Sequence, residues 1–233
     1  MTAIDAQRTV AELVTERPGR ARVFERLGIE YCCRGKRPLA EACAEQQLDV
    51  ATVTTMLAAM EAGAGAGGAD WAQAPLAELC DHIVETHHSY LRDELPRLSA
   101  LTGKVTRAHG GKHPELKDVA ATFERMVAEL DLHMLKEEDV LFPVCKRLEQ
   151  GEPIAAEALG APIAVMEHEH AYVGAALERL HELTQGYEPP EDACNSYRAL
   201  LDGLATLERD LHEHIHEENN ILFPRAAALA ESA

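Results

Sequence analysis

Apolar residues recur over much of the chain at the i, i+3, i+4, i+7 spacing of helices that bury one face. The pattern predicts four long helices, at roughly 75–102, 114–148, 155–185 and 190–219, and a short closing helix near 221–230. Glycine and proline mark the breaks between these segments, so the connections are short. Long helices with short connections predict an antiparallel four-helix bundle.

A smaller helical unit is predicted before the bundle. Short helices are expected at 8–16, 18–27, 38–47 and 49–61. The segment 63–70 is so rich in glycine that it carries too much chain entropy for a helix. We therefore predict a small helical domain over 1–62, a linker over 63–70 and the bundle over 71–233. The fold class is all-α, with little or no strand, because β-branched and aromatic residues are scarce.

Charge is distributed unevenly along the chain. Forty acidic and 22 basic residues give a formal charge of −18, which disfavours a nucleic-acid or anionic-membrane surface. Residues 1–68 hold 9 acidic and 8 basic residues, so the remainder holds 31 and 14, a net of −17. All twelve histidines lie in that acidic remainder. This half of the chain has the composition that a cation site requires.

The N-terminal residues do not follow the charged-then-apolar pattern of a signal peptide, and no apolar run approaches the length of a membrane span. Six cysteines are scattered without regular spacing. These features predict a cytoplasmic protein with free thiols.

An internal repeat carries the candidate chemistry. HMLKEEDVLFP at 133–143 and HIHEENNILFP at 214–224 agree in the histidine, in a glutamate four residues on, and in the ending Leu-Phe-Pro. Another histidine precedes each copy, His88 in the first case and His170 in the second, and these two are 82 residues apart. The bundle is therefore predicted to be a duplicated pair of helices.

Each copy of the repeat places a histidine and a glutamate on one helix face. Residues at i and i+4 lie roughly 40° apart around the helix axis and about 6 Å apart along it. Imidazole suits iron, and a carboxylate has two oxygens with which to bridge two ions. Six protein ligands are too many for one tetrahedral zinc and suit two non-haem irons, bridged also by oxo or hydroxo. The predicted ligands are His88, His133, Glu137, His170, His214 and Glu218.

Neighbouring residues leave part of this assignment open. The alternatives are His87 or His88, His168 or His170, and His216 or His214. The repeat fixes the register of His133, Glu137, His214 and Glu218, and it places the other two ligands only to within about a residue. Glu169 is a candidate for an outer or substitutable ligand.

The remaining polar residues near the repeat are assigned simpler roles. Glu138 and Glu217 are expected to be solvated. The remaining histidines are expected on the surface or in packing: His82, His109, His113, His181 and His212. Phe142 and Phe223 are expected to seal the bundle end. The prolines that follow them, Pro143 and Pro224, are expected to end or kink their helices.

Adjacent cysteines form a second unusual feature, in the segment Tyr31-Cys32-Cys33-Arg34-Gly35-Lys36-Arg37. Adjacent cysteines seldom form a disulfide with each other, and the three nearby cations favour thiolate. We expect these thiols to be more reactive than average and to serve a redox or metal-related role.

Together these motifs resemble the Repair of Iron Centres family of iron-sulfur cluster repair di-iron proteins. The resemblance covers nearly the whole chain: YCC-x-GK at 31–36, then VMEHEH at 165–170 and the two repeated segments. It implies a hemerythrin-like bundle after a small domain that carries Cys32 and Cys33 as its functional pair. It also selects His88 and His170 as ligands, with Glu137 and Glu218 as bridges. The extra histidines beside the ligands depart from the family pattern.

The resemblance further implies a cytoplasmic protein of the nitrosative and oxidative stress response. Such a protein repairs damaged iron-sulfur proteins by donating iron, more as a repair factor than as a turnover enzyme, with a homodimer as one assembly state. One alternative is an enzyme that reduces nitric oxide or another oxidant at open iron positions. Another is a hemerythrin-like carrier of O2 or NO, whose pattern has a further histidine four residues after His170, where this chain has Gly174.

Overall fold

The computed structural model describes residues 4–61 and 70–232. Within those ranges every regular element is helical, and the one β-type pairing is an isolated bridge between Thr9 and Pro38. The predicted all-α fold class is confirmed. In the same ranges no helix is both long and apolar enough to cross a bilayer.

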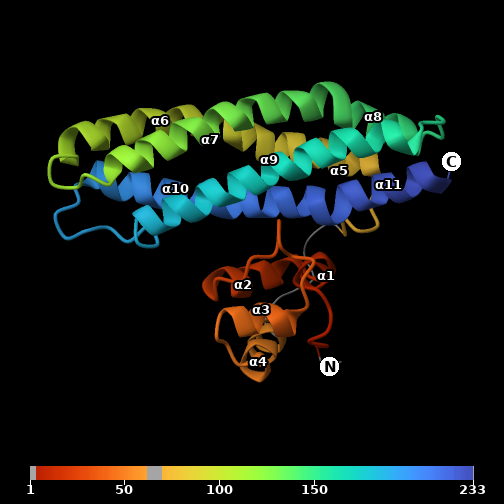
Figure 1. The fold of residues 1–233 in the computed structure, drawn as a ribbon, viewed down its shortest axis with the longest axis horizontal. Coiled ribbons are helices and arrows are strands. Elements are labelled where there is room, and N and C mark those ends of the chain that lie inside the picture. Colours follow the sequence, from red (N-terminus) through yellow and green to blue (C-terminus); the bar gives the residue numbers. More distant parts are fainter. Residues whose placement is uncertain (1–3, 62–69, 233) are drawn as a thin grey trace.

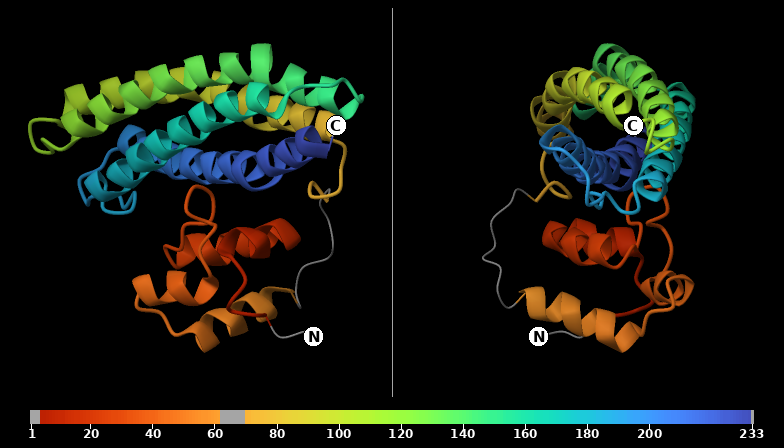
Figure 2. Two further views of the ribbon diagram at one scale, coloured as in Figure 1. Left: turned by 45° about the vertical axis from the view of Figure 1, so that its right-hand side comes forward. Right: turned by 90° about the vertical axis from the view of Figure 1, so that its left-hand side faces the viewer.

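Four long helical rods form the bundle, and three of them contain one π-helical turn. The rods are α5 (Leu76–Ile83), η2 (Val84–His88) and α6 (Ser89–His109); α7 (Leu116–Lys136), η3 (Glu137–Leu141) and α8 (Phe142–Glu149); α9 (Ala156–Leu183); and α10 (Asn195–Glu217), η4 (Glu218–Leu222) and α11 (Phe223–Ser232). α6 packs against α7 and α10, and α9 packs against α7 and α11 (Figure 1). The view along the bundle shows the rods around one axis (Figure 2).

The N-terminal helices lie beside the bundle, below α10 in Figure 1. They are α1 (Val10–Glu16), the 3-10 turn η1 (Pro18–Arg20), α2 (Ala21–Arg26), α3 (Leu39–Glu45) and α4 (Val50–Glu61). Thr9 and Glu12 form a reciprocal capping box that starts α1. The predicted linker, apart from Asp70, lies outside the described residues, and the proposed division into domains stays a prediction.

Prolines 143 and 224 do not end their rods, so one of the two outcomes expected for them is wrong. A π-helical turn precedes each one: the Phe142 N–H bonds to the Glu137 carbonyl, and the Phe223 N–H bonds to the Glu218 carbonyl. Proline lacks an N–H and its ring crowds the carbonyl four residues earlier, which a wider turn relieves. The rods therefore run on as α8 and α11. The last rod begins at Asn195 rather than 190, after the pair Pro189-Pro190.

Two apolar clusters divide the bundle along its length. One contains Leu91, Leu130 and Leu211, together with core residues of the N-terminal helices. The other contains Ile83 and Leu222 and reaches the opposite end of the rods. The repeated histidines and glutamates lie between the two clusters, where apolar side chains exclude water on both sides.

Candidate metal centre

Six ionisable side chains converge between the two apolar clusters, and none is more than 2% exposed. Their ligand atoms form two groups of four, and within each group all the atoms lie within 4.8 Å of one another. The groups are His88, Glu137, His214 and Glu218; and His133, Glu137, His170 and Glu218. Both groups share the two glutamates, so each half of the repeat supplies ligands to both.

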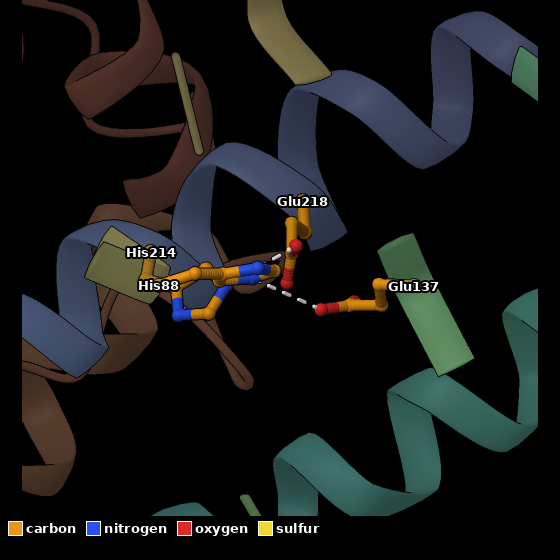
Figure 3. A group of neighbouring side chains, drawn as sticks. All are labelled: His88, Glu137, His214 and Glu218. Carbon is orange, nitrogen blue, oxygen red and sulfur yellow. Dashed lines mark ion pairs between the residues drawn. The ribbon is translucent and has the colours of Figure 1, made fainter. Parts of the chain in front are cut away.

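The spacing of the ligand atoms suits metal coordination. Glu218 directs one oxygen to each group: Oε1 lies 3.2 Å from His214 Nε2, and Oε2 lies 3.0 Å from His170 Nε2. Glu137 Oε2 lies 3.3 Å from Nε2 of both His88 and His133. Figure 3 shows the first group, with imidazoles and carboxylates facing a common point. Two ligands at right angles on bonds of about 2.1 Å are separated by about 3.0 Å.

The rods place these ligands at the edges of the π-helical turns. His88 is the last residue of η2, Glu137 opens η3 and Glu218 opens η4. The turn just before each glutamate is still α-helical, because the Glu137 N–H bonds to the His133 carbonyl and the Glu218 N–H to that of His214. The i, i+4 geometry predicted from the sequence is therefore present. π-helical turns often occur at functional sites.

A second layer of polar side chains orients the imidazoles. The Nδ1 atoms of His88, His133 and His170 lie 2.6 Å from Glu138, 3.0 Å from Glu169 and 2.8 Å from Asn219 respectively. These contacts leave Nε2 free to face the centre, as is typical of metal-binding histidines. Glu169 thus occupies an outer position, one of the two roles considered for it.

Glu138 is not simply solvated, contrary to expectation. Its side chain is 24% exposed and contacts both His88 and Arg92. Glu138 and Asn219 each follow a central glutamate of the repeat and each contacts the upstream histidine of the same half. The two copies of the repeat both have a polar residue directly after the central glutamate. This shared feature of the sequence could have identified Glu138 and Asn219 as partners of the upstream histidines.

The phenylalanines of the repeat cover the ligand histidines. The ring of Phe142 stacks on His88 with centroids 5.8 Å apart, and the ring of Phe223 stacks on His170 at 5.9 Å. Both are buried in the apolar cluster at the α8 and α11 end of the rods. They cover this side of the centre part-way along the rods, whereas they were expected at the bundle end, and they also fix the planes of two imidazoles.

Burial sets the protonation of the centre. It lowers the pKa of His133 to about 4, with help from the adjacent His170, and it lowers the pKa of His214 to about 3. These imidazoles are neutral at pH 7, which is the form that binds metal. Burial and the charge of Glu218 raise the pKa of Glu137 well above its ordinary value. Positive ions between the two carboxylates would offset the repulsion between them.

The unsatisfied polar atoms of the centre fit bound cations. Both oxygens of Glu137 and both of Glu218 are buried without a hydrogen-bond partner among the described residues. The same holds for Nε2 of His88 and of His214. Leaving such atoms unpaired costs about 1–3 kcal/mol each, and more for charged groups. Divalent ions would satisfy all of them together.

The competing histidines lie outside the six-residue cluster. His168 is exposed. His87 is buried but turns to Asp210, with Nδ1 2.9 Å from Oδ1. His216 is buried between the bundle and the N-terminal helices, where Nε2 lies 3.3 Å from Thr15 Oγ1 and Nδ1 lies 3.4 Å from the Tyr31 carbonyl.

The loop between α2 and α3 lies against the bundle (Figure 2), and Cys32 and Cys33 are part of this loop. The Cys33 thiol lies 3.5 Å from the carbonyl oxygen of His170, and Asn220 donates to the Cys32 carbonyl at 2.9 Å. Their sulfurs are 3.8 Å apart, and all six cysteines are free, as predicted. The pair is therefore next to a residue of the candidate centre.

The expected activation of Cys32 by nearby cations is wrong. Burial, the neighbouring Cys33 and the Glu30 carboxylate raise the pKa of Cys32 well above its ordinary value, and Glu30 Oε1 lies 2.8 Å from its sulfur. The cations of the segment face elsewhere: Lys36 lies 3.4 Å from Glu167, and Arg37 pairs with Glu45.

The second layer of polar side chains gives a matched prediction. Asn219→Ala removes the partner of His170 and is expected to weaken metal affinity about 10- to 100-fold. Asn220→Ala is the control, since Asn220 contacts the Cys32 carbonyl instead and should leave metal affinity unchanged. Metal titration of both purified variants measures the difference. Equal affinities would show that Asn219 does not orient a ligand.

Comparison with known proteins connects this centre to a family. Residues 80–226 match the hemerythrin HHE cation-binding domain, and residues 6–61 match a domain of unknown function, DUF542. The iron-sulfur cluster repair protein YtfE of Edwardsiella ictaluri is 41% identical over 219 residues, covering 94% of this chain and 96% of the relative. The proteins of that name from Pectobacterium carotovorum and Escherichia coli O81 are 38% and 40% identical, with the same coverage of both chains.

Proposed function

Since this chain belongs to the family of iron-sulfur cluster repair proteins, we propose that it restores damaged iron-sulfur clusters with iron held by its six buried ligands. The clients are iron-sulfur proteins damaged by nitric oxide or oxidants, in the cytoplasm. One observation carries the proposal: the buried histidines and glutamates form two groups of ligands that share both carboxylates.

The ligand arrangement supports a pair of irons rather than a single ion. Each group offers two imidazoles and an oxygen from each of two shared glutamates, which is the donor set of a carboxylate-bridged pair. Histidine and carboxylate ligands suit ferrous iron, and bound iron would supply the material from which a cluster is rebuilt. The assignment of His88, His133, Glu137, His170, His214 and Glu218 as ligands is part of the proposal.

The balance of charge supports exchangeable iron. Two ferrous ions carry four positive charges, whereas the six ligands supply two carboxylates and four neutral imidazoles. The site leaves part of the cation charge uncompensated and coordination positions open. Both features favour release of iron to a client over permanent storage.

The cysteine pair is placed to assist this transfer. The Cys33 thiol lies 3.5 Å from the backbone carbonyl of His170, a residue of the candidate centre. We assign Cys32 and Cys33 a role in passing iron or electrons between the centre and the client. Cys32 is buried and Cys33 is half-buried, so the loop must shift before a client reaches Cys32.

The oxygen-carrier alternative fits the structure less well. A carrier of the hemerythrin pattern has a histidine where this chain has Gly174. A Cβ atom at Gly174 would lie 3.5 Å from the Cys33 sulfur, in van der Waals contact, so an imidazole there would have to share this space with the docked loop. Gly174 lies beside the loop that carries Cys33, and it cannot supply the fifth imidazole of an oxygen carrier.

A repair assay tests the proposal. Aconitase inactivated with nitric oxide is incubated anaerobically with the iron-loaded protein and a reductant. We expect more recovery of aconitase activity than an equal amount of free ferrous ion gives, and none with the metal-free protein. Recovery that matches free iron would contradict repair. Formation of nitrous oxide without recovery would instead indicate the nitric oxide reductase alternative.

A further inference from the structure

A second cluster of metal-type ligands lies beside the six-residue centre. Ligand atoms of His82, His87 and Glu217 all lie within 4.8 Å of one another. The cluster adjoins the main centre, because the His87 ring lies parallel to that of His214 with centroids 5.2 Å apart. Glu217 was expected to be solvated, but its side chain is only 14% exposed, and that of His82, expected on the surface or in packing, is 25% exposed.

Each imidazole of this cluster is held through Nδ1 and faces the carboxylate through Nε2. His87 Nδ1 lies 2.9 Å from Asp210, and His82 Nδ1 lies 3.2 Å from the Thr86 hydroxyl. The two Nε2 atoms lie 3.6 Å and 3.4 Å from different oxygens of Glu217. A partner on Nδ1 with Nε2 directed inward is the usual arrangement of metal-binding histidines.

The atoms that face the middle of this cluster lack hydrogen bonds. His87 Nε2 and Glu217 Oε2 are buried without a partner in the part of the chain that the structure describes. Their separation of 3.6 Å is too long for a hydrogen bond. It suits two ligands of one ion, since tetrahedral ligands on bonds of about 2.1 Å lie about 3.4 Å apart. The geometry therefore favours a cation over a direct ion pair.

The local field also favours a positive charge at this position. Asp210 Oδ1 lies 2.9 Å from His87 Nδ1, and Glu217 Oε2 lies 3.6 Å from His87 Nε2. Two carboxylates thus surround the imidazole, whose side chain is 3% exposed. A divalent ion bound at Nε2 would balance these negative charges.

A cavity connects this cluster with the junction between the N-terminal helices and the bundle. It has a volume of about 160 Å³, and its lining includes Trp71, Tyr31, His216 and Glu217. The ring of Trp71 stacks on His82 at 4.2 Å and covers its outer face. A hydrated cation in the cavity would meet the carboxylate of Glu217 directly.

We propose that His82, His87 and Glu217 form a third metal site that binds one divalent transition-metal ion, ferrous iron in this protein. Two imidazoles and one carboxylate with open positions are the ligand set of mononuclear non-haem iron sites. Asp210 and Thr86 position the two histidines. Resting on the proposed repair function, the site holds an iron on its way into or out of the paired centre, at the end that faces the cavity.

Counting bound ions at equilibrium tests the third site. The metal-free full-length protein is dialysed anaerobically against ferrous ion, and bound iron per chain is measured by elemental analysis. We expect three irons in the unmodified protein and two in Glu217→Gln. Glu213→Gln is the matched control, since it removes a carboxylate from the same helix and cavity but not from the cluster, and should keep three.

His82→Gln provides a second variant in case Glu217→Gln disturbs the neighbouring Glu218. It should also bind two irons, with an unchanged circular dichroism spectrum. Two irons in the unmodified protein, or three in both variants, would overturn the proposal. Failure of the proposed repair function can be distinguished from failure of the third site. It would appear as no recovery of aconitase, while the unmodified protein still bound three irons and Glu217→Gln still bound two.

Discussion

Glu218→Ala is expected to remove most of the bound iron while leaving the helices folded. Glu218 is the residue whose two oxygens face different ligand groups, towards His214 on one side and His170 on the other. Its loss should therefore weaken both positions of the pair at once. Changing a residue that only orients a ligand costs about 10- to 100-fold in metal affinity, so the loss here should exceed 100-fold.

The fold should survive this change because the ligands are not what holds the rods together. Apolar clusters lie on both sides of the centre, and the metal-free protein already carries two buried carboxylates that repel each other. Without metal, the variant should keep its circular dichroism spectrum. It should lose the metal-dependent rise in stability, which for a site at 100 times its Kd is about 2.7 kcal/mol.

Elemental analysis and thermal unfolding with and without iron measure these effects. Glu137→Ala should behave in the same way, since its carboxylate is also shared by both groups. Glu129→Ala is the control: Glu129 is exposed on α7, two turns before Glu137. If Glu137→Ala and Glu218→Ala both retained the full iron content, the proposed ligand assignment would be wrong.

Replacing both Cys32 and Cys33 with serine is expected to abolish most repair while leaving the iron content unchanged. The thiols are not among the six converging ligands, and Cys33 contacts the backbone of His170 rather than its imidazole. Serine preserves size and the docked loop but removes a soft iron ligand and a redox-active group. Recovery of aconitase should then approach that given by free iron.

The control for this variant is Cys194→Ser, which removes an exposed thiol at the start of α10. It should repair at the unmodified rate. Full activity of the double serine variant would assign Cys32 and Cys33 to packing at the junction between the N-terminal helices and the bundle. Loss of iron from the double variant would instead indicate that docking of the loop supports the centre.

Much of this fold could be predicted from sequence because its information is local. Apolar periodicity and short connections depend on neighbours a few residues apart, and they predicted four antiparallel rods. The π-helical turns could not be predicted in this way. Two of them, η3 and η4, lie just before Pro143 and Pro224 in rods that packing keeps continuous, so tertiary contacts outweigh the local tendency of proline to end a helix. The third, η2, has no proline directly after it.

Ligand choice shows the same division. The sequence alone led to the proposal of His133 with Glu137, and of His214 with Glu218, because the i, i+4 spacing is a property of one helix. Whether His87 or His88 faces the centre depends on how the whole rod is rotated. Side chains of adjacent residues point about 100° apart around the helix axis. The π-helical turn η2 changes this angle locally, so the direction of each side chain cannot be read from the spacing alone.

The sequence by itself determined the helical class and predicted the duplication and four of the six proposed ligands, since each follows from spacing along the helices. Only the tertiary structure decided the environment of each side chain. It turned Glu138 and Asn219 towards imidazoles, buried Cys32 against Glu30, and gathered His82, His87 and Glu217 beside the centre. Burial and charge depend on what neighbouring elements bring close, and that information is spread over the whole chain.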